Sequence, residues 1–432
     1  MAKHSPISTS VVVVGGGPAG LATSWHLTGR GIAHVVLERG RMAERWRSER
    51  WESLRLLTPN RHAHLPGWRY SGERPDGFMT MPEVIEWIDS YASSFDAPVL
   101  TDTPVLEARV DGEGFAVETP GTTFLSDALV VATGAEPSMP AWRESLVGSI
   151  IQLHSSRYLR PDELDEGGVL VVGASASGIQ LADELNRAGR RVVLSVGSHT
   201  RLPRTYRGRD IHWWLDLSGK LDVTIDQVAD PDRARRSPSL QLVGSPDRRS
   251  LDLNSVSDAG VELVGRAIGA RDTAMEFAND LASSCEKADR RQMRLLDDFD
   301  ALATAAGFDH QLATPYRPIP TRIPPAPPSI DLARYGITTV LWATGFRPSY
   351  PWLRVPVVDD QGRIRHHGGV ADWPGLYLMG LPFMRRRRST FLDGFGADAD
   401  AIVRHIADYL AGHELLPALT GDPAEGGARR TT

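Results

Sequence analysis

The sequence predicts an α/β fold with two βαβ units, the second of which lies in a domain inserted into the domain of the first. Two observations support this prediction. A short valine-rich run, a glycine-rich turn and a helical pattern follow one another twice, at residues 11–27 and 169–188. Both runs are uniformly apolar, which is typical of parallel strands covered on both faces. The expected architecture is therefore two Rossmann-like dinucleotide-binding domains.

The first unit contains a complete dinucleotide motif. A strand at residues 11–14 leads into a turn with the pattern G-x-G-x-x-G, which opens a helix whose N-terminus attracts phosphate. The turn residues expected to bind a pyrophosphate are Gly15, Gly17, Pro18, Ala19 and Gly20. Glu38 ends the next strand, at residues 34–37, where a carboxylate would accept hydrogen bonds from ribose hydroxyls. This unit is predicted to bind a dinucleotide.

The second unit departs from the motif in two ways. Its expected binding residues are Gly173, Ser175, Ser177 and Gly178. Ser175 replaces the middle glycine, and the next strand ends at Ser195, so no carboxylate is placed to select a free 2'-hydroxyl. Arg201 and Arg204 follow, and a guanidinium group suits a 2'-phosphate. The pattern favours NADPH over NADH, although both arginines could also be solvated loop residues.

Further segments indicate how the two domains are joined. Apolar strands are expected at residues 129–132, 340–343 and 376–379, a helical region at 253–306 and an extended proline-rich crossing at 315–328. The predicted boundaries are 1–160 and 326–420 for the first domain, 161–325 for the inserted domain, and 421–432 for a disordered tail.

Composition excludes several classes of protein. A formal net charge of -6 with interspersed charges argues against a nucleic-acid partner, and no apolar run is long enough for a membrane span. The N-terminus lacks the pattern of a signal peptide. Cys285 is the only cysteine, which excludes an intrachain disulfide and indicates a cytoplasmic location. No metal site is expected, because His62 and His64 have no accompanying ligand pattern.

The motifs together resemble the two-dinucleotide-domain, class B flavin-dependent monooxygenases, and among them bacterial relatives of flavin-containing monooxygenases and of the plant YUCCA enzymes. The resemblance covers nearly the whole chain, including residues 131–134, 343–346 and 375–380. It implies a glutathione-reductase-like arrangement, with FAD at the first turn, NADPH at the second, and a helix from Ser389 through Asp398 directed at the flavin. A homodimer is left open as the oligomeric state.

The resemblance also implies particular site residues. A degenerate form of the family fingerprint ends in His154 and Tyr158, and the stretch at residues 51–60 resembles the one that lines the flavin. Asn60 and His154 are therefore the candidate catalytic residues, with an interdomain hydrogen bond as the alternative role of His154. The further cofactor-binding residues are Arg39, Trp46, Val105, Thr133, Gly134, Thr344, Gly345 and Gly380.

The implied function is oxygen transfer. NADPH would reduce the flavin, O2 would add to form a C4a-hydroperoxyflavin, and one oxygen atom would pass to a small organic substrate, with N- or S-oxygenation favoured. Because the cofactor supplies the chemistry, no catalytic triad is required. The alternatives are a Baeyer-Villiger or oxidative-decarboxylating monooxygenase, and a non-oxygenating NADPH oxidase or redox-sensing regulatory flavoprotein. A disulfide reductase is excluded because Cys285 has no partner cysteine.

Overall fold

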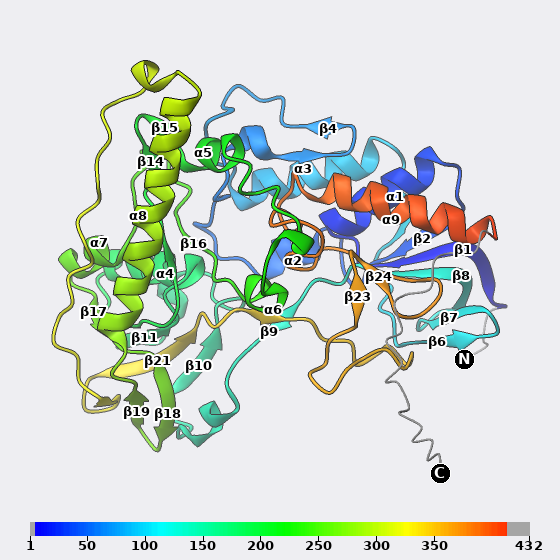
Figure 1. The fold of residues 1–432 in the computed structure, drawn as a ribbon. Coiled ribbons are helices and arrows are strands. Elements are labelled where there is room, and N and C mark those ends of the chain that lie inside the picture. The colour runs from blue at the N-terminus through cyan, green and yellow to red at the C-terminus, as the bar shows by residue number, and fades with distance from the viewer. Residues whose placement is uncertain (1–4, 413–432) are drawn as a thin grey trace, which may run out of the picture.

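The computed structural model describes residues 5–412, which fold into two adjacent α/β domains (Figure 1). Each domain is built on a sheet whose central strands are parallel. The α/β fold class with two Rossmann-like domains is therefore confirmed. The tail predicted at residues 421–432 lies outside the described residues.

The first domain contains a nine-stranded sheet. Its order is β23-β24-β25-β8-β1-β2-β5, and the hairpin β6-β7 is attached at β8. The strands are β1 (Ile7–Val14), β2 (His34–Leu37), β5 (Val99–Leu100), β6 (Glu107–Asp111), β7 (Gly114–Glu118), β8 (Thr123–Val131), β23 (His366–His367), β24 (Val370–Ala371) and β25 (Leu376–Leu378). Because β1 pairs in parallel with β2 and β8, and β8 with β25, their carboxyl ends lie side by side.

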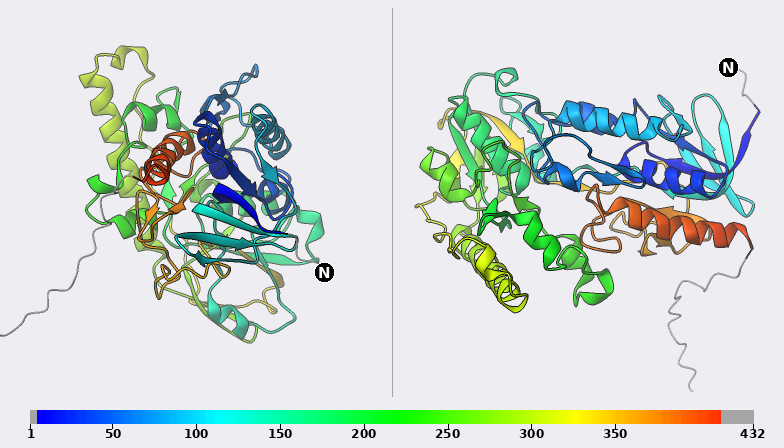
Figure 2. Two further views of the ribbon diagram at one scale, coloured as in Figure 1. Left: turned by 90° about the vertical axis from the view of Figure 1, so that its right-hand side faces the viewer. Right: turned by 90° about the horizontal axis from the view of Figure 1, so that it is seen from above.

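Helices cover one face of this sheet. Alternate residues of β1, including Val11 and Val13, pack with α1 (Pro18–Gly29), α3 (Met81–Ser93) and α9 (Phe395–Leu410). Helices α1 and α9 come from opposite ends of the chain and lie side by side (Figure 2). The opposite face packs against β6-β7 and residues 350–364. The first domain is thus assembled from both ends of the chain, as predicted.

The second domain contains a five-stranded parallel sheet in the order β10-β21-β11-β12-β17. The strands are β10 (Ile151–His154), β11 (Gly168–Val172), β12 (Val192–Ser195), β17 (Glu262–Val264) and β21 (Ile337–Trp342). One face packs against α4 (Ala176–Arg187), α7 (Leu253–Asp258) and the start of α8 (Leu281–Ala305). The other face packs against a small sheet of β18 (Ala267–Arg271), β19 (Ala274–Phe277) and β20 (Ser329–Asp331).

The predicted domain boundaries are wrong, because the second sheet takes strands from both flanks of its βαβ unit. Strands β10 and β21 pair with each other in that sheet, and β21 also pairs with β11, so neither belongs to the first domain. The two crossings between the domains are β9 (Glu136–Pro137) and β22 (Phe346–Arg347), which pair in antiparallel fashion. The inserted domain therefore runs from about residue 138 to about residue 345.

Two predicted helical regions are also corrected. Between α7 and α8 the chain forms β17, which is the edge strand of the five-stranded sheet, and the hairpin β18-β19 of the small sheet. The helix expected to begin at Ser389 begins at Phe395, as the backbone N–H of Gly394 donates instead to Phe391 in an irregular turn. The proline-rich crossing at 315–328 contains no helix or strand.

An arm of the second domain reaches the first. It comprises residues 200–242, with the elements β13 (Thr200–Arg201), β14 (Thr205–Tyr206), β15 (Arg209–Asp210), α5 (Ile211–Leu217), α6 (Pro231–Arg235) and β16 (Leu240–Gln241). The backbone of residues 221–225 hydrogen-bonds to that of 385–388, just before α9. The arm thus forms a wall between the two domains.

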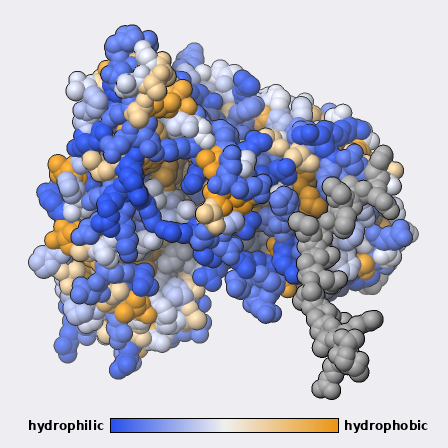
Figure 3. Space-filling view, in the orientation of Figure 1, coloured by the Kyte–Doolittle hydropathy of each residue, from blue (hydrophilic) through white to orange (hydrophobic). Residues whose placement is uncertain are grey.

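Among the described residues, no helix combines the length and the apolar character needed to cross a membrane. The face shown in Figure 3 is mostly hydrophilic, with small and separate hydrophobic areas.

Candidate functional site

A large cavity is lined by residues of both domains. Its volume is about 2430 Å³, well above the roughly 300–1,000 Å³ of a pocket for one drug-sized ligand. It opens at the carboxyl ends of β1, β2 and β8 in one sheet and of β11 and β21 in the other, where open α/β sheets bind ligands. All predicted cofactor residues line it except Gly20, Ser177, Gly178 and Arg204. A separate surface depression beside α3 contains none of them.

The first glycine-rich turn has the geometry of a phosphate cradle. Gly15 has a φ of +114°, and a Cβ added there would lie 2.5 Å from the carbonyl oxygen of Ala132. A Cβ at Gly20 would lie 2.0 Å from the carbonyl oxygen of Gly15, so Gly20 serves helix packing and not the cavity wall. A Cβ at Gly17 would meet nothing within 4 Å and would project at the cavity. The residues present therefore fit a pyrophosphate beside Gly17.

Glu38 and the basic residues near it complete this end of the cavity. The Glu38 carboxylate accepts hydrogen bonds from the backbone N–H groups of Gly16, at 2.7 Å, and Gly40, at 3.1 Å, and lines the cavity beside the turn. Arg50, which sequence reasoning missed, also lines the cavity, and burial lowers its pKa. Its one hydrogen bond within residues 5–412 goes to the carbonyl of Glu49. A cofactor phosphate would supply the anion that this guanidinium lacks.

The second turn repeats the geometry of the first. Gly173 has a φ of +106°, and its Cβ would lie 2.5 Å from the carbonyl oxygen of Ala343. A Cβ at Gly178 would lie 1.7 Å from the carbonyl oxygen of Gly173, which places Gly178 in the packing of α4 against β11. Ser175 lines the cavity at the N-terminus of α4, and its side chain caps no backbone group. Thr344 and Gly345 line the wall beside it.

The structure places Arg201 and Arg204 in buried ion pairs, and of the two only Arg201 lines the cavity. The Arg201 side chain is 2% exposed and bound at 2.6 Å by Asp252 and at 2.7 Å by Asp289. The Arg204 side chain is fully buried and held by Asp210, at 2.5 Å, and by the carbonyl of Leu57. Both guanidinium groups are therefore already neutralised, and breaking such buried pairs costs roughly 3–5 kcal/mol. They hold the arm in place and leave no free cation for a phosphate.

Neither candidate catalytic residue lines the cavity. The Asn60 amide donates to the carbonyl of Arg74, at 2.8 Å, and accepts from the backbone N–H of Met79, at 2.6 Å, so it fixes the loop around it. His154 accepts from the backbone N–H of Ser156 through Nδ1 and lies 3.0 Å from the carbonyl of Gly345 through Nε2. Burial lowers the pKa of His154, which keeps the ring neutral. These hydrogen bonds fix the end of β10 to the segment that leads into β22, so they lie within the second domain and are not interdomain.

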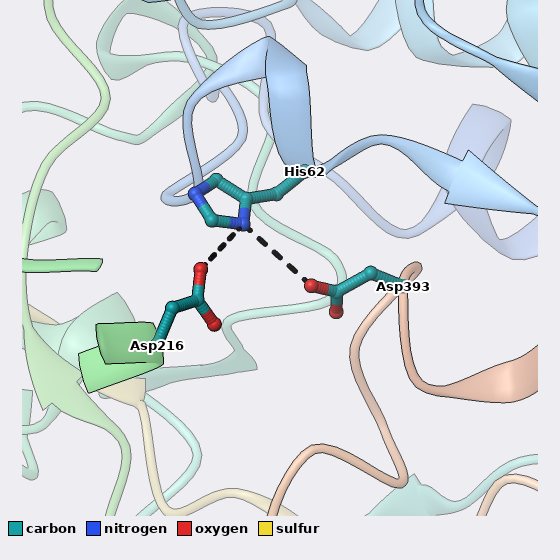
Figure 4. Close-up of side chains that lie close together, drawn as sticks. All are labelled: His62, Asp216 and Asp393. Carbon is teal, nitrogen blue, oxygen red and sulfur yellow. Dashed lines mark ion pairs between the residues drawn. The ribbon is translucent and has the colours of Figure 1, made fainter. Parts of the chain in front are cut away.

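A cluster that the sequence did not predict closes one end of the cavity. His62 follows the cavity-lining residues 56–58, and its Nδ1 lies 3.3 Å from Asp216 of α5 and 3.6 Å from Asp393 before α9 (Figure 4). Arg388 donates to both carboxylates at 2.9 Å. No sequence signal indicates this cluster, because its members come from three segments far apart in the chain.

The same cluster has nitrogen and oxygen atoms that could bind a metal ion, but the Arg388 guanidinium already supplies a positive charge there. The ligand atoms of His62, Asp216 and Asp393 lie within 4.8 Å of one another. Arg388 neutralises both acids, and a metal ion there would face its positive charge at short range. We therefore assign the cluster a structural role in joining the arm to the first domain.

Thiol chemistry has no support in this chain. Cys285 lies in the buried face of α8, against the second sheet, and does not line the cavity. Burial raises its pKa to about 12, so the reactive thiolate is disfavoured at neutral pH.

Two glycine-rich turns that face one cavity define a two-dinucleotide flavoprotein oxidoreductase, which uses FAD and NADPH. The family of pyridine nucleotide-disulphide oxidoreductases matches residues 12–214. The chain is 31% identical over 404 residues to an oxidoreductase described as CzcO-like from Geobacillus kaustophilus, covering 92% of this chain and 98% of that protein.

Other relatives refine this class. The indole-3-pyruvate monooxygenase YUCCA6 of Arabidopsis thaliana is 32% identical over 214 residues, covering 47% of this chain and 51% of that protein. A flavin-containing monooxygenase from Stenotrophomonas maltophilia has the same fold, with a TM-score of 0.64 at 21% identity, covering 94% of this chain and 99% of that one. The chain belongs to the family of CzcO-like oxidoreductases, which match it along its length, and about half of it is similar to the YUCCA flavin monooxygenases.

Proposed function

We propose that this protein is an FAD- and NADPH-dependent monooxygenase that transfers one oxygen atom to a small organic substrate, with nitrogen or sulfur as the favoured acceptor. The observation that carries the proposal is the continuous cavity joining the two glycine-rich turns. A hydride can pass between two cofactors only when both reach a common space, and this cavity provides one. FAD would bind at the turn around Gly17 and NADPH at the turn around Ser175.

The residues of the chain would bind and orient the two cofactors and the substrate, while the bound flavin would supply the redox chemistry and O2 activation. Gly17 would let a pyrophosphate approach the N-terminus of α1, Glu38 holds the turn and would be available to ribose hydroxyls, and Arg50 would neutralise phosphate charge. The arm and the segment before α9 wall off the far end, which limits the access of water to the reacting atoms.

The wall near the His62 cluster supports a small, partly apolar substrate. Phe391, Leu215, Leu221 and His212 line the cavity there, and the rings of His212 and Phe391 lie 6.5 Å apart. Burial lowers the pKa of His212, so this wall carries a neutral ring at neutral pH. A soft nitrogen or sulfur nucleophile needs little acid-base assistance from the protein. This agrees with the positions of Asn60 and His154, which do not line the cavity.

The test is a mass balance with 18O2. The purified FAD-loaded protein is supplied with NADPH and a panel of tertiary amines and thioethers, and NADPH consumption, peroxide and labelled product are measured together. We expect one 18O atom in an N-oxide or sulfoxide for each NADPH consumed with at least one substrate. Peroxide equal to NADPH for every compound would contradict oxygen transfer and favour an NADPH oxidase or redox sensor. Labelled esters from added ketones would favour Baeyer-Villiger chemistry.

A further inference from the structure

The loop after β12 forms the cavity wall where a dinucleotide domain meets the adenosine ribose. Gly197, Ser198 and Thr200 of this loop line the cavity. The Ser195 hydroxyl, at the position of the usual acid, is turned inward, where it donates to the carbonyl of Gly265 and accepts from the N–H of Ala267. The side chains of this loop that line the cavity therefore offer no carboxylate to a ribose 2'-hydroxyl.

A different cation faces this loop. Arg291 lies on α8, which packs against β13 directly after the loop, and it lines the cavity with Gln292 and Leu295. Its side chain forms no hydrogen bond or ion pair with any residue in the range 5–412. Arg291 and the loop residues Ser198 and Thr200 thus line the same cavity.

Asp289, the acid nearest to Arg291 in the sequence, is already used by other groups. Asp289 binds Arg201 through Oδ1 and accepts from the backbone N–H of Thr321 through Oδ2. Both of its oxygens are thus used inside the protein, two residues before Arg291. This leaves the Arg291 guanidinium without an acidic partner among residues 5–412, beside a loop of small and hydroxyl residues, a combination that suits a phosphate monoester.

We propose that Arg291 binds the 2'-phosphate of NADPH and so selects NADPH over NADH. The inference rests on the proposed binding of NADPH at the second turn. The preference for NADPH is thereby assigned to a residue of α8. Arg201 and Arg204, which follow the loop in the sequence, form ion pairs with carboxylates.

The test uses binding of fragments to the FAD-loaded protein by isothermal titration calorimetry. The probes are 2',5'-ADP, which carries the 2'-phosphate, and 5'-AMP, which lacks it. We expect the wild-type protein to bind 2',5'-ADP more tightly than 5'-AMP. In Arg291→Ala the affinity for 2',5'-ADP should fall roughly tenfold or more, while that for 5'-AMP changes by less than about twofold. Arg291→Lys should retain part of the preference.

Arg290→Ala is the matched control. Arg290 is the adjacent helix residue, its side chain is 63% exposed, it pairs with Glu286 and it does not line the cavity. The Arg290→Ala variant should bind 2',5'-ADP and 5'-AMP with wild-type affinities. A preference for 2',5'-ADP that survives in Arg291→Ala would overturn the role of Arg291 and leave NADPH use intact. A wild-type protein that binds both probes equally would overturn NADPH selection itself, and with it this inference.

Discussion

Asn60 was chosen from its place in the sequence, but its side chain does not face the cavity. Its side chain is 1% exposed and makes two hydrogen bonds to the backbone of its own loop. The sequence places Asn60 beside the cavity-lining residues 56–58, but only the path of the loop decides which side chain faces the cavity.

Asn60→Ala should therefore lower stability and leave cofactor reduction in place. Removing the amide leaves the carbonyl of Arg74 and the N–H of Met79 unsatisfied, which should lower the free energy of unfolding by about 2 kcal/mol or more. Urea denaturation measures this loss. The rate at which NADPH bleaches the flavin should change by less than about twofold. A normal stability with a reduction rate down by orders of magnitude would restore the catalytic assignment.

His154 makes a prediction about pH. Its folded-state pKa is lowered by burial, so at a pH below its ordinary value of 6.5 the unfolded chain binds a proton that the folded chain does not. Its contribution to stability is present above pH 6.5 and is lost as the pH falls, by at most about 1.4 kcal/mol per pH unit. The acid-induced loss of stability should be smaller in His154→Gln than in the wild type, measured by urea denaturation between pH 7.5 and 5. The exposed His310→Gln serves as control and should follow the wild-type curve.

At the scale of elements, local patterns were predictable and long-range pairings were not. The strand at 34–37 was predicted with the bounds that the structure shows, and the strand after the second turn ends at Ser195 as predicted, because each is a short, largely apolar run that follows a helix. The small sheet β18-β19-β20 was missed, because β19 pairs with a strand some fifty residues later and β18 has no fully buried residue. The ion pairs of Arg201 were missed for the same reason, as Asp252 and Asp289 lie far along the chain.

The first turn gives a prediction that separates binding from folding. Gly17 has a φ of -84° and open space at its Cβ position, so Gly17→Ala should fold with an unchanged melting temperature as apoprotein. Its new methyl group would project where the pyrophosphate approaches, so the affinity for FAD should fall roughly tenfold or more. The measurements are the ratio of flavin to protein and the dissociation constant after reconstitution.

Gly20→Ala is the contrasting variant. Its Cβ would lie 2.0 Å from the carbonyl oxygen of Gly15, so it should lower the melting temperature of the apoprotein itself. If Gly17→Ala bound FAD with wild-type affinity, the pyrophosphate would have to bind elsewhere than at this turn.

At the scale of the whole molecule, Arg388 joins the arm of the second domain to the first. Its guanidinium donates to Asp216 and Asp222 on the arm side and to Asp393 before α9, each at 2.9 Å, and its side chain is 15% exposed. Arg388→Ala should lower the free energy of unfolding by about 2 kcal/mol, below the roughly 3–5 kcal/mol of a fully buried pair because solvent screens part of the charge. It should also speed proteolysis of the arm.

Arg386→Ala is the control for this variant. Among the described residues the Arg386 side chain makes no ion pair, so its removal should leave both stability and proteolysis close to wild type. Equal behaviour of the two variants would mean that the backbone pairing of 221–225 with 385–388 alone holds the arm.

The central claim is that both cofactors meet in one cavity and that the reduced flavin reacts with O2 there in a protected form. The most direct measurement is to reduce the FAD-loaded protein with NADPH without oxygen, mix it rapidly with oxygenated buffer, and record absorbance spectra over seconds to minutes. We predict that NADPH bleaches the flavin and that a long-lived spectrum follows, distinct from oxidised and reduced flavin. A flavin that NADPH fails to bleach would contradict the shared cavity, and an immediate return to oxidised flavin with stoichiometric peroxide would contradict the monooxygenase.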